Sequence, residues 1–397
     1  MASDTEIIVI GSGPAALAAA KILTHNGIDF QIITEDSKPG QNKVCGGFVS
    51  GRAIDDFDLK DIPNSYPVLA VRMKFPGMDS VIVQFDEQVG VNVDRGDLGS
   101  YLLKQADIIR SNHYFDCSVT SIERIQRKMV CNVQSGDEKF QVSSGLVIDC
   151  SGANPVSLKR GLVRNRLDNG QMGYAMQYHL ETDESIPTVN DFYYGKTFSP
   201  GGYAWIFPRG QHVVVGTGGL ISRVKSAKKN LNEYLNTLLL YISEHENRLN
   251  DHRVIKREAA VLPLSGPVTP NHANGILLAG DAGGQCSPIT GEGIHYALFA
   301  GRIAASVAIE AAREKRFDDD FLKKYDKLWQ KEFGSDLKWG LRLQSLFLDS
   351  GSDRMNNSFL SSKKNQRKIA ELLLGIRSVR GTIFSIIPSY VKSKLLG

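Results

Sequence analysis

Two glycine-rich turns, far apart in the sequence, hold the residues whose types and spacing could do chemistry. The first reads GSGPAA over residues 11–16 and fits the pattern G-x-G-x-x-G/A, with an apolar run before it and an alanine-rich run after it. In that context Gly11 permits a tight turn and Gly13 lets the backbone approach a pyrophosphate, while the small Ala16 allows close helix–strand packing. The turn therefore predicts a nucleotide site at a helix N-terminus.

An acidic residue is expected about 20 residues beyond such a turn, where it would hold the hydroxyl groups of a ribose. The chain reads Thr34-Glu35 at the end of the second apolar strand. We expect Glu35 to take this role, although direct counting without a gap places Thr34 there. Both residues stay candidates.

The second glycine turn lies in the run GILLAGDAGGQCSPITGEGI over residues 275–294. A short buried strand is expected to deliver Asp281, whose carboxylate could accept hydrogen bonds from a polyol chain. Gly291 and Gly293 would then bring the start of the next helix close to a flat ring. Amide groups at that helix N-terminus would stabilise negative charge developing on the ring.

Cys45 is the sharpest candidate for a reacting side chain, because it stands between an extended pair of residues and two glycines. A thiol is mostly protonated at neutral pH and could donate a proton. The alternative is a small residue packed against a bound ring without chemical duty. Cys286 lies in the second turn and could approach the same ring, whereas strand-like patterns around Cys117, Cys131 and Cys150 predict core positions.

A run of aromatic residues reads GGYAWIFPRG over residues 201–210. The period of two places Tyr203, Trp205 and Phe207 on one face of a strand. They could form the aromatic wall of a long apolar pocket, or the core of a sheet.

Three sequence patterns predict the elements that must position these residues. The chain of 397 residues, 42% of them apolar, opens with a strand–helix–strand unit, alternates like sheet over 172–220, and is helical and charged beyond 318. We predict a mixed α/β (α+β) fold, in which a Rossmann-like nucleotide-binding domain interleaves with an antiparallel-sheet substrate domain and a C-terminal helical region. The expected boundaries are 1–64, 94–165 and 266–318 for the first domain, 65–93 and 166–265 for the second, and 319–397 for the helical region.

Charge and cysteine content exclude several classes of function. Residues 361–397 carry eight Lys or Arg against one Glu, so within a net charge of +4 the rest of the chain is mildly acidic and nucleic-acid binding is not expected. Five scattered cysteines predict neither a disulfide framework nor a metal site. The acidic N-terminus and the lack of a long apolar run predict a cytoplasmic protein. The basic tail leaves two interpretations open, an amphipathic patch resting on anionic lipid or a helical cap with a solvated face.

The pairing of GSGPAA with GDAGGQCSPITGEGI resembles the FAD-dependent oxidoreductases of the p-hydroxybenzoate hydroxylase fold. The segments KVCGG (43–47) and GGYAWIFPRG narrow the resemblance to the geranylgeranyl reductase family, especially the archaeal enzymes that saturate digeranylgeranylglycerophospholipids. The resemblance runs from residue 5 to about residue 345 and implies FAD as the cofactor. Carried over position by position, its FAD contacts fall on Ala15, Cys45, Gly46, Phe48, Arg95, Val119, Asp281, Gly293 and Ile294.

The resemblance further implies an activity, the reduction of isolated double bonds in a long isoprenoid chain, either a geranylgeranyl lipid or a prenyl diphosphate of archaeal-type membrane lipid biosynthesis. Hydride would come from the flavin, and Cys45 is the candidate proton donor. Ser151 stands where hydroxylases of this fold usually have aspartate, and there is no second dinucleotide fingerprint. The external electron donor (NAD(P)H, ferredoxin or another reductant) therefore stays open, as do the number of bonds reduced and the oligomeric state.

Two other functions are weighed against this one. The first is a flavin-dependent monooxygenase or halogenase of the same fold, since YAWIFP is similar to the halogenase pattern W-x-W-x-I-P. The second is a non-enzymatic carrier of prenyl chains. The two intact glycine turns argue against a carrier, which would need no flavin cradle.

Overall fold

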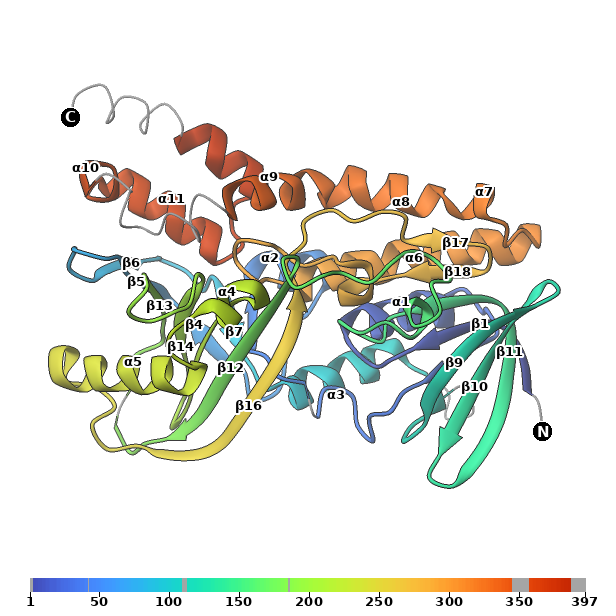
Figure 1. The fold of residues 1–397 in the computed structure, drawn as a ribbon, viewed down its shortest axis with the longest axis horizontal. Helices are drawn as coiled ribbons and strands as arrows, with labels where there is room; N and C mark the ends of the chain where they lie inside the picture. The colour runs from blue at the N-terminus through green and yellow to red at the C-terminus, as the bar shows by residue number, and fades with distance from the viewer. Residues whose placement is uncertain (1–2, 42, 109–112, 185, 345–356, 387–397) are drawn as a thin grey trace.

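The computed structural model describes residues 3–41, 43–108, 113–184, 186–344 and 357–386. Two large sheets lie side by side along the molecule, and the helices after residue 293 lie along one side of both of them (Figure 1). The mixed α/β class predicted from the sequence is confirmed.

The first sheet contains the strand that leads into the first glycine turn. Its strand order is β17-β18-β11-β1-β2-β8, and β9 and β10 extend it as an antiparallel meander with β11. β1 pairs in parallel with both β2 and β11. The strands span β1 (Ser3–Ile10), β2 (Phe30–Ile33), β8 (His113–Tyr114), β9 (Ser118–Ile125), β10 (Lys128–Ser135), β11 (Glu138–Asp149), β17 (His272–Ala273) and β18 (Ile276–Leu278).

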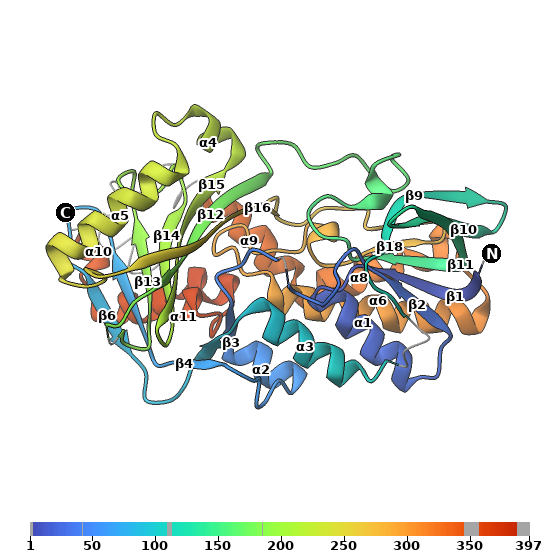
Figure 2. The ribbon, with the colours of Figure 1, turned by 90° about the horizontal axis from the view of Figure 1, so that it is seen from below.

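The apolar run in β1 is continuous because both faces of this strand are buried. Ile7 and Val9 pack under the helices α1 (Pro14–His25) and α6 (Ile294–Glu314), while Ile8 and Ile10 point into a separate cluster on the opposite face. α1 begins with Pro14 at a position where no amide donor is needed, and it ends at His25, with Asn26 as its C-cap before Gly27. Seen from below, α1 and α3 (Arg95–Ala106) lie next to each other along this sheet (Figure 2).

The second sheet carries the aromatic strand. Its order is β16-β12-β15-β14-β13-β5-β6, antiparallel except for the pair β13 and β5. The strands span β5 (Ala70–Lys74), β6 (Val81–Gln84), β12 (Met172–Glu181), β13 (Val189–Tyr194), β14 (Tyr203–Arg209), β15 (His212–Leu220) and β16 (Arg253–Pro263). A small third sheet joins β3 (Phe48–Ser50), β7 (Gly90–Asn92) and β4 (Tyr66–Val68).

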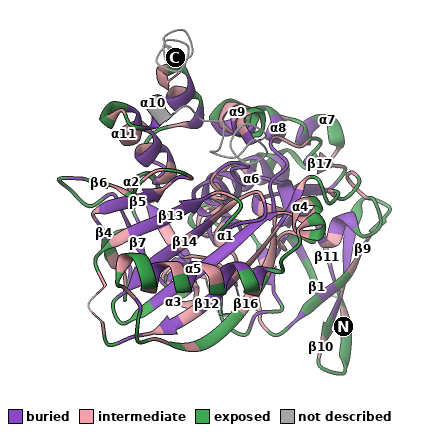
Figure 3. Ribbon diagram, turned by 60° about the vertical axis from the view of Figure 1, so that its left-hand side comes forward, coloured by how far each residue is buried: buried purple, intermediate pink, exposed green. Residues whose placement is uncertain are grey.

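The two faces of the second sheet have different covers. α5 (Leu231–Glu246) packs on the face that carries Ala204 and Ile206 and exposes its outer side (Figure 3). The opposite face, with Phe192 and Phe207, packs against buried residues of α10 (Asn357–Leu360) and α11 (Lys363–Leu373). Other helices of the described residues are α2 (Gly51–Phe57), α4 (Ile221–Ser226), α7 (Asp319–Leu322), α8 (Lys324–Trp329) and α9 (Ser335–Gln344), and residues 379–386 are also helical.

The segment 65–93 is divided between sheets. Its β5–β6 hairpin joins the second sheet, while β7 pairs with both β3 and β4 in the small third sheet. The division of the chain into interleaved domains stays a prediction. Within the described residues, no helix combines the length and the apolar character that crossing a bilayer requires.

Candidate active site

A cavity of about 1060 Å³ lies between the two large sheets. Both glycine turns, the loop around Cys45 and the aromatic strand β14 border it. With one exception, every site residue predicted from the sequence lines this cavity. The exception is Ala16, which is fully buried in the packing of α1 and borders no open space.

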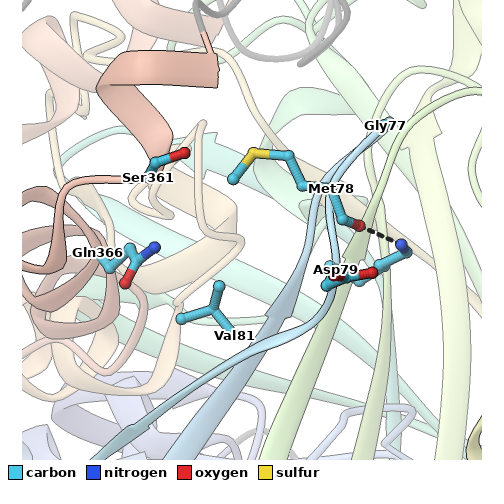
Figure 4. A pocket seen from close by; sticks show the side chains of 7 residues that line it. Gly77, Met78, Asp79, Val81, Ser361 and Gln366 are labelled. Atoms are coloured by element: carbon cyan, nitrogen blue, oxygen red, sulfur yellow. Dashed lines mark hydrogen bonds between the residues drawn. The ribbon is translucent and has the colours of Figure 1, made fainter.

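A second hollow, of about 560 Å³, lies between the β5–β6 turn and the C-terminal helices (Figure 4). Met78 and Val81 from the hairpin face Gln366 of α11 across it. Lys74 also lines this hollow, and its ammonium donates to the Met78 carbonyl. None of the predicted site residues borders this hollow, so the larger cavity is the candidate site.

The two glycines of the first turn are required for different reasons. Gly11 has a φ of +101°, and a Cβ there would stand 2.5 Å from the Cys150 carbonyl oxygen, so the fold itself demands glycine. Gly13 has an ordinary φ of −74°, and a Cβ there would meet no atom of the described chain within 4 Å. The fold leaves room at Gly13, and that room opens onto the cavity.

The end of β2 separates the two candidates for the ribose site. Thr34 is only 2% exposed, and its hydroxyl lies 3.3 Å from the Ser12 hydroxyl and accepts from the Asp36 amide at 3.2 Å. Glu35 is exposed and borders the cavity. Thr34 is therefore engaged in local structure, while the carboxylate of Glu35 is available to a ligand.

Asp36 was not singled out by the sequence pattern, yet it organises this end of the cavity. It is buried, accepts a hydrogen bond of 2.6 Å from Ser12 and pairs with Lys43 at 3.4 Å. These contacts tie the first turn to the end of β2. The only signal in the sequence was an acid next to Glu35 at the end of a buried strand.

Arg95 offers a positive charge to the cavity. It is the first residue of α3, directly after the capping residue Asp94. Its Nη1 lies 3.9 Å from the Cys45 sulfur, and its buried Nε has no hydrogen-bond partner among the described residues. Because buried polar groups are nearly always paired, this guanidinium is suited to an anionic ligand.

Asp281 follows β18 and borders the cavity near Arg95. Burial raises the pKa of Asp281 above its ordinary value, while the positive charges of Arg95 and Lys43 oppose this effect. Its position beside the second glycine turn is the one that the sequence pattern predicted for an acceptor of polyol hydrogen bonds.

The five cysteines differ in what they can do. Cys45 is half-buried at the cavity wall, and its sulfur accepts from the Gly47 amide at 3.4 Å. Cys286 also lines the cavity, but it is 2% exposed, and burial next to Asp281 and Glu292 raises the pKa of its thiol well above the ordinary range. The three predicted core cysteines are buried, yet only Cys131 lies within a strand; Cys117 and Cys150 stand just outside strand ends and border the cavity.

The aromatic residues of β14 serve both predicted purposes, since they line the cavity and pack in the core. Phe192 of the neighbouring strand contacts Tyr203 and Phe207, with ring centroids 5.4 and 5.5 Å apart. The indole Nε1 of Trp205 is buried without a partner among the described residues. A Cβ on Gly46 would stand 2.8 Å from the Phe207 ring, so glycine lets the Cys45 loop lie against this wall.

Residues from the second glycine turn and from α11 lie next to the aromatic wall of the cavity. The Tyr203 hydroxyl donates to the Thr290 carbonyl at 2.5 Å, which ties β14 to the second glycine turn. Leu373 at the end of α11 borders the cavity. α11 therefore contributes to the cavity wall.

Comparisons with known proteins agree with this arrangement. The model of the geranylgeranyl reductase catalytic domain matches residues 171–262. The digeranylgeranylglycerophospholipid reductase 2 of Methanopyrus kandleri is 28% identical over 98% of both chains. The digeranylgeranylglycerophospholipid reductase of Methanocaldococcus jannaschii is 26% identical over 88% of both chains.

Solved structures show the same fold. A geranylgeranyl bacteriochlorophyll reductase-like protein of Thermoplasma acidophilum superposes with a TM-score of 0.82 at 22% identity, covering 99% of this chain and 98% of its own. The flavin-dependent halogenase CmlS superposes with a TM-score of 0.70 at 17% identity, covering 98% of this chain and 77% of its own.

Proposed function

We infer that this chain, which belongs to the geranylgeranyl reductase family, is a flavin-dependent oxidoreductase that saturates carbon–carbon double bonds of a long isoprenoid chain. The observation that carries this function is the single cavity that joins a nucleotide-type turn to an aromatic wall, with Cys45 between them. We further propose that the isoprenoid is part of a glycerophospholipid, the substrate named for the curated relatives.

The residues present fit a flavin. Arg95 presents an unpaired buried nitrogen, and the space beside Gly13 is open. We propose FAD in particular, because the cavity extends past the first turn to Glu35 and Val119, which gives room for an adenosine half. Arg95 and the amides that begin α1 would hold its phosphates, and Glu35 its ribose.

Replacement of Glu35 tests the choice of FAD. We expect Glu35→Ala to weaken FAD binding by about 10- to 100-fold, because a charged hydrogen bond contributes about 1.5–3 kcal/mol. FMN lacks the adenosine half, so its binding should change little. Titration of the flavin-free protein with each flavin measures both affinities. A larger loss of FAD affinity in Thr34→Val than in Glu35→Ala would instead assign the ribose to Thr34.

A bound flavin supplies the electron pair that such a reduction needs, as hydride. Cys45 is placed to give the proton: its S–H bond breaks, a C–H bond forms at the other alkene carbon, and the electron pair stays on sulfur. The Gly47 amide and the Arg95 guanidinium already lie beside that sulfur, where they would stabilise the negative charge. Water can then return the proton.

The aromatic wall would bind the isoprenoid and exclude water from the reacting carbons. Tyr203, Trp205 and Phe207 lie along one face of β14, with Leu373 bordering the same cavity. Such a surface recognises a hydrocarbon chain by apolar contact and imposes no hydrogen-bond pattern on it.

The electron donor is proposed to be external. Ser151 lines the cavity, but its hydroxyl donates to the Asp149 carboxylate at 2.5 Å. The hydroxyl is therefore already engaged in a hydrogen bond within the chain. Asp149 also accepts from Ser157 at 2.5 Å. This network shapes the loop after β11 and offers no free carboxylate to a nicotinamide.

An anaerobic reaction tests the function. Chemically reduced enzyme is mixed with a geranylgeranylated glycerophospholipid, and we expect the flavin to reoxidise while the lipid gains two hydrogen atoms per bond. Reoxidation only in air, with an oxygenated or halogenated product, would support the monooxygenase or halogenase alternative, with which the shared halogenase fold is compatible. Purified protein without any flavin would support a carrier.

A cationic, aromatic surface beside the cavity suggests peripheral contact with an anionic membrane. Trp339 of α9 meets Phe384 edge to face with ring centroids 5.3 Å apart, Arg342 lies over Trp339 and Arg380 over Phe384. The segment 363–386 carries six basic residues and only Glu371 as an acid. Aromatic rings rimmed by cations are typical of surfaces that bind anionic lipid. Residues 387–397, the rest of the basic tail, lie outside the described residues.

Charge reversal on this surface tests the membrane proposal. We expect Arg342→Glu/Arg380→Glu to weaken binding to phosphatidylglycerol vesicles at least tenfold in low salt, since each cation near the surface contributes about 1 kcal/mol. Co-sedimentation measures the binding. The matched control is Arg124→Glu/Arg127→Glu, which changes one exposed residue near the end of β9 and one in the turn before β10, at the other end of the molecule (Figure 1). Equal losses in both variants would leave α9 and the 378–386 segment as a solvated cap.

A further inference from the structure

The loop that carries Cys45 is held by two side chains from the second sheet. Arg209 Nη2 donates to the Gly46 carbonyl at 2.7 Å, and Gln177 Nε2 donates to the Cys45 carbonyl at 3.3 Å. These acceptors are consecutive along the backbone. Neither donor was singled out from the sequence, because nothing local to β12 or β14 marks a side chain that reaches another sheet.

Arg209 connects the loop to the helix that carries Arg95. It is 6% exposed, and its Nη1 pairs with Asp94 at 3.4 Å. Asp94 caps α3 by accepting from the Gly96 amide at 2.7 Å, and Arg95 is the next residue. One guanidinium therefore fixes the carbonyl after Cys45 and the start of α3 together.

Glycine in the loop makes this contact possible. A Cβ on Gly47, whose φ is +80°, would stand 2.2 Å from Arg209 Nη2 and 2.2 Å from the Val93 carbonyl oxygen. The Gly47 carbonyl in turn accepts from the Val93 amide at 2.9 Å. The loop is thus packed closely between β7 and the Arg209 side chain.

Gln177 is oriented by an anchored acid. Its Nε2 donates to Glu258 at 3.1 Å, and Glu258 also contacts His179 Nε2 at 2.8 Å and pairs with Lys256. Burial alone would raise the pKa of Glu258, but hydrogen bonds from Lys256, His179 and Gln177 bring it below its ordinary value. A carboxylate and a backbone carbonyl both only accept, so the amide nitrogen of Gln177 must face the loop.

We propose that Arg209 and Gln177 are positioning residues that fix the Cys45 sulfur against the Gly47 amide and the Arg95 guanidinium. The role rests on the proposed function, in which Cys45 gives a proton to the substrate. Both donors lie on strands whose other residues line the apolar part of the cavity. The two hydrogen bonds would therefore fix the position of the Cys45 loop relative to the aromatic wall. Loss of either donor should loosen the loop without removing the cavity.

The experiment compares Arg209→Met, Arg209→Lys and Gln177→Leu with Arg253→Met, which removes an exposed arginine paired with Glu181 on the same sheet. Hydrogen exchange of the flavin-loaded protein, resolved by mass spectrometry, reports on the peptide that covers residues 43–49. We expect Arg209→Met to speed exchange of this peptide at least tenfold while peptides of β14 and β15 stay protected. The maximal rate of alkene reduction should fall at least tenfold at an unchanged KM, and Arg209→Lys should recover part of it, since lysine can still donate to the Gly46 carbonyl.

Gln177→Leu keeps the test informative if Arg209→Met does not fold, and it should show the same local exchange with a smaller loss of rate. Unchanged exchange in the 43–49 peptide would overturn the proposal, and so would a loss confined to KM or an equal effect of Arg253→Met. Failure of the wild-type protein to reduce any isoprenoid would refute the proposed function instead, while the exchange measurement would still decide whether the two donors hold the loop.

Discussion

Replacing Cys45 by alanine will leave the flavin bound and slow alkene reduction at least tenfold. The thiol lies at the cavity wall, with the Gly47 amide at 3.4 Å and the Arg95 guanidinium at 3.9 Å from its sulfur. A positioned general acid typically contributes 10²–10⁴-fold to a rate, so its loss should dominate the kinetics. Stopped-flow reoxidation of reduced enzyme at saturating lipid measures the step directly, and the visible spectrum reports the flavin content.

Cys286→Ala is the matched control for this prediction. Cys286 borders the same cavity, but the pKa of its thiol is raised by burial and by the acids beside it. Its removal should leave the rate within a few-fold of the wild type. Unchanged turnover in Cys45→Ala at saturating substrate would remove the thiol from the mechanism, and a slow Cys286→Ala would move the role to the second turn.

Threonine at position 13 will abolish tight flavin binding without destabilising the flavin-free protein. Gly13 caps α1, and threonine is about as favourable as glycine at a helix N-cap. The chain itself leaves the space beside Gly13 open, so the added atoms can only obstruct a ligand. We expect the affinity for the flavin to fall at least 100-fold, which corresponds to about 2.8 kcal/mol. Flavin titration and thermal melting of the flavin-free protein measure the two effects separately.

Gly11→Ala should behave in the opposite way. Its Cβ would stand 2.5 Å from the Cys150 carbonyl oxygen at a φ of +101°, so we expect lower thermal stability even without flavin. If Gly13→Thr binds flavin as tightly as the wild type, the first turn does not approach the cofactor, and the proposed phosphate site is wrong.

The sequence by itself determined the features that depend on a few neighbouring residues. The glycine turns at 11–16 and 280–294 and the alternation in residues 203–207 are local signals, and they predicted both turns and the aromatic strand. The glycines beside Cys45 likewise marked it as the candidate reacting thiol. The apolar run before the first turn likewise predicted a strand, and the structure buries that strand, β1, on both faces.

Only the tertiary structure decided which side chains complete the site. The sequence left both Thr34 and Glu35 open for the ribose; the hydrogen bonds of Thr34 with Ser12 and Asp36 favour Glu35, which stays a prediction. Arg209 and Gln177 reach the Cys45 loop from strands more than a hundred residues away in the chain, and no local sequence pattern predicts these contacts. The physical reason is that backbone preferences act over a few residues, whereas burial and hydrogen-bond partners are set by segments that meet only when the sheets pack.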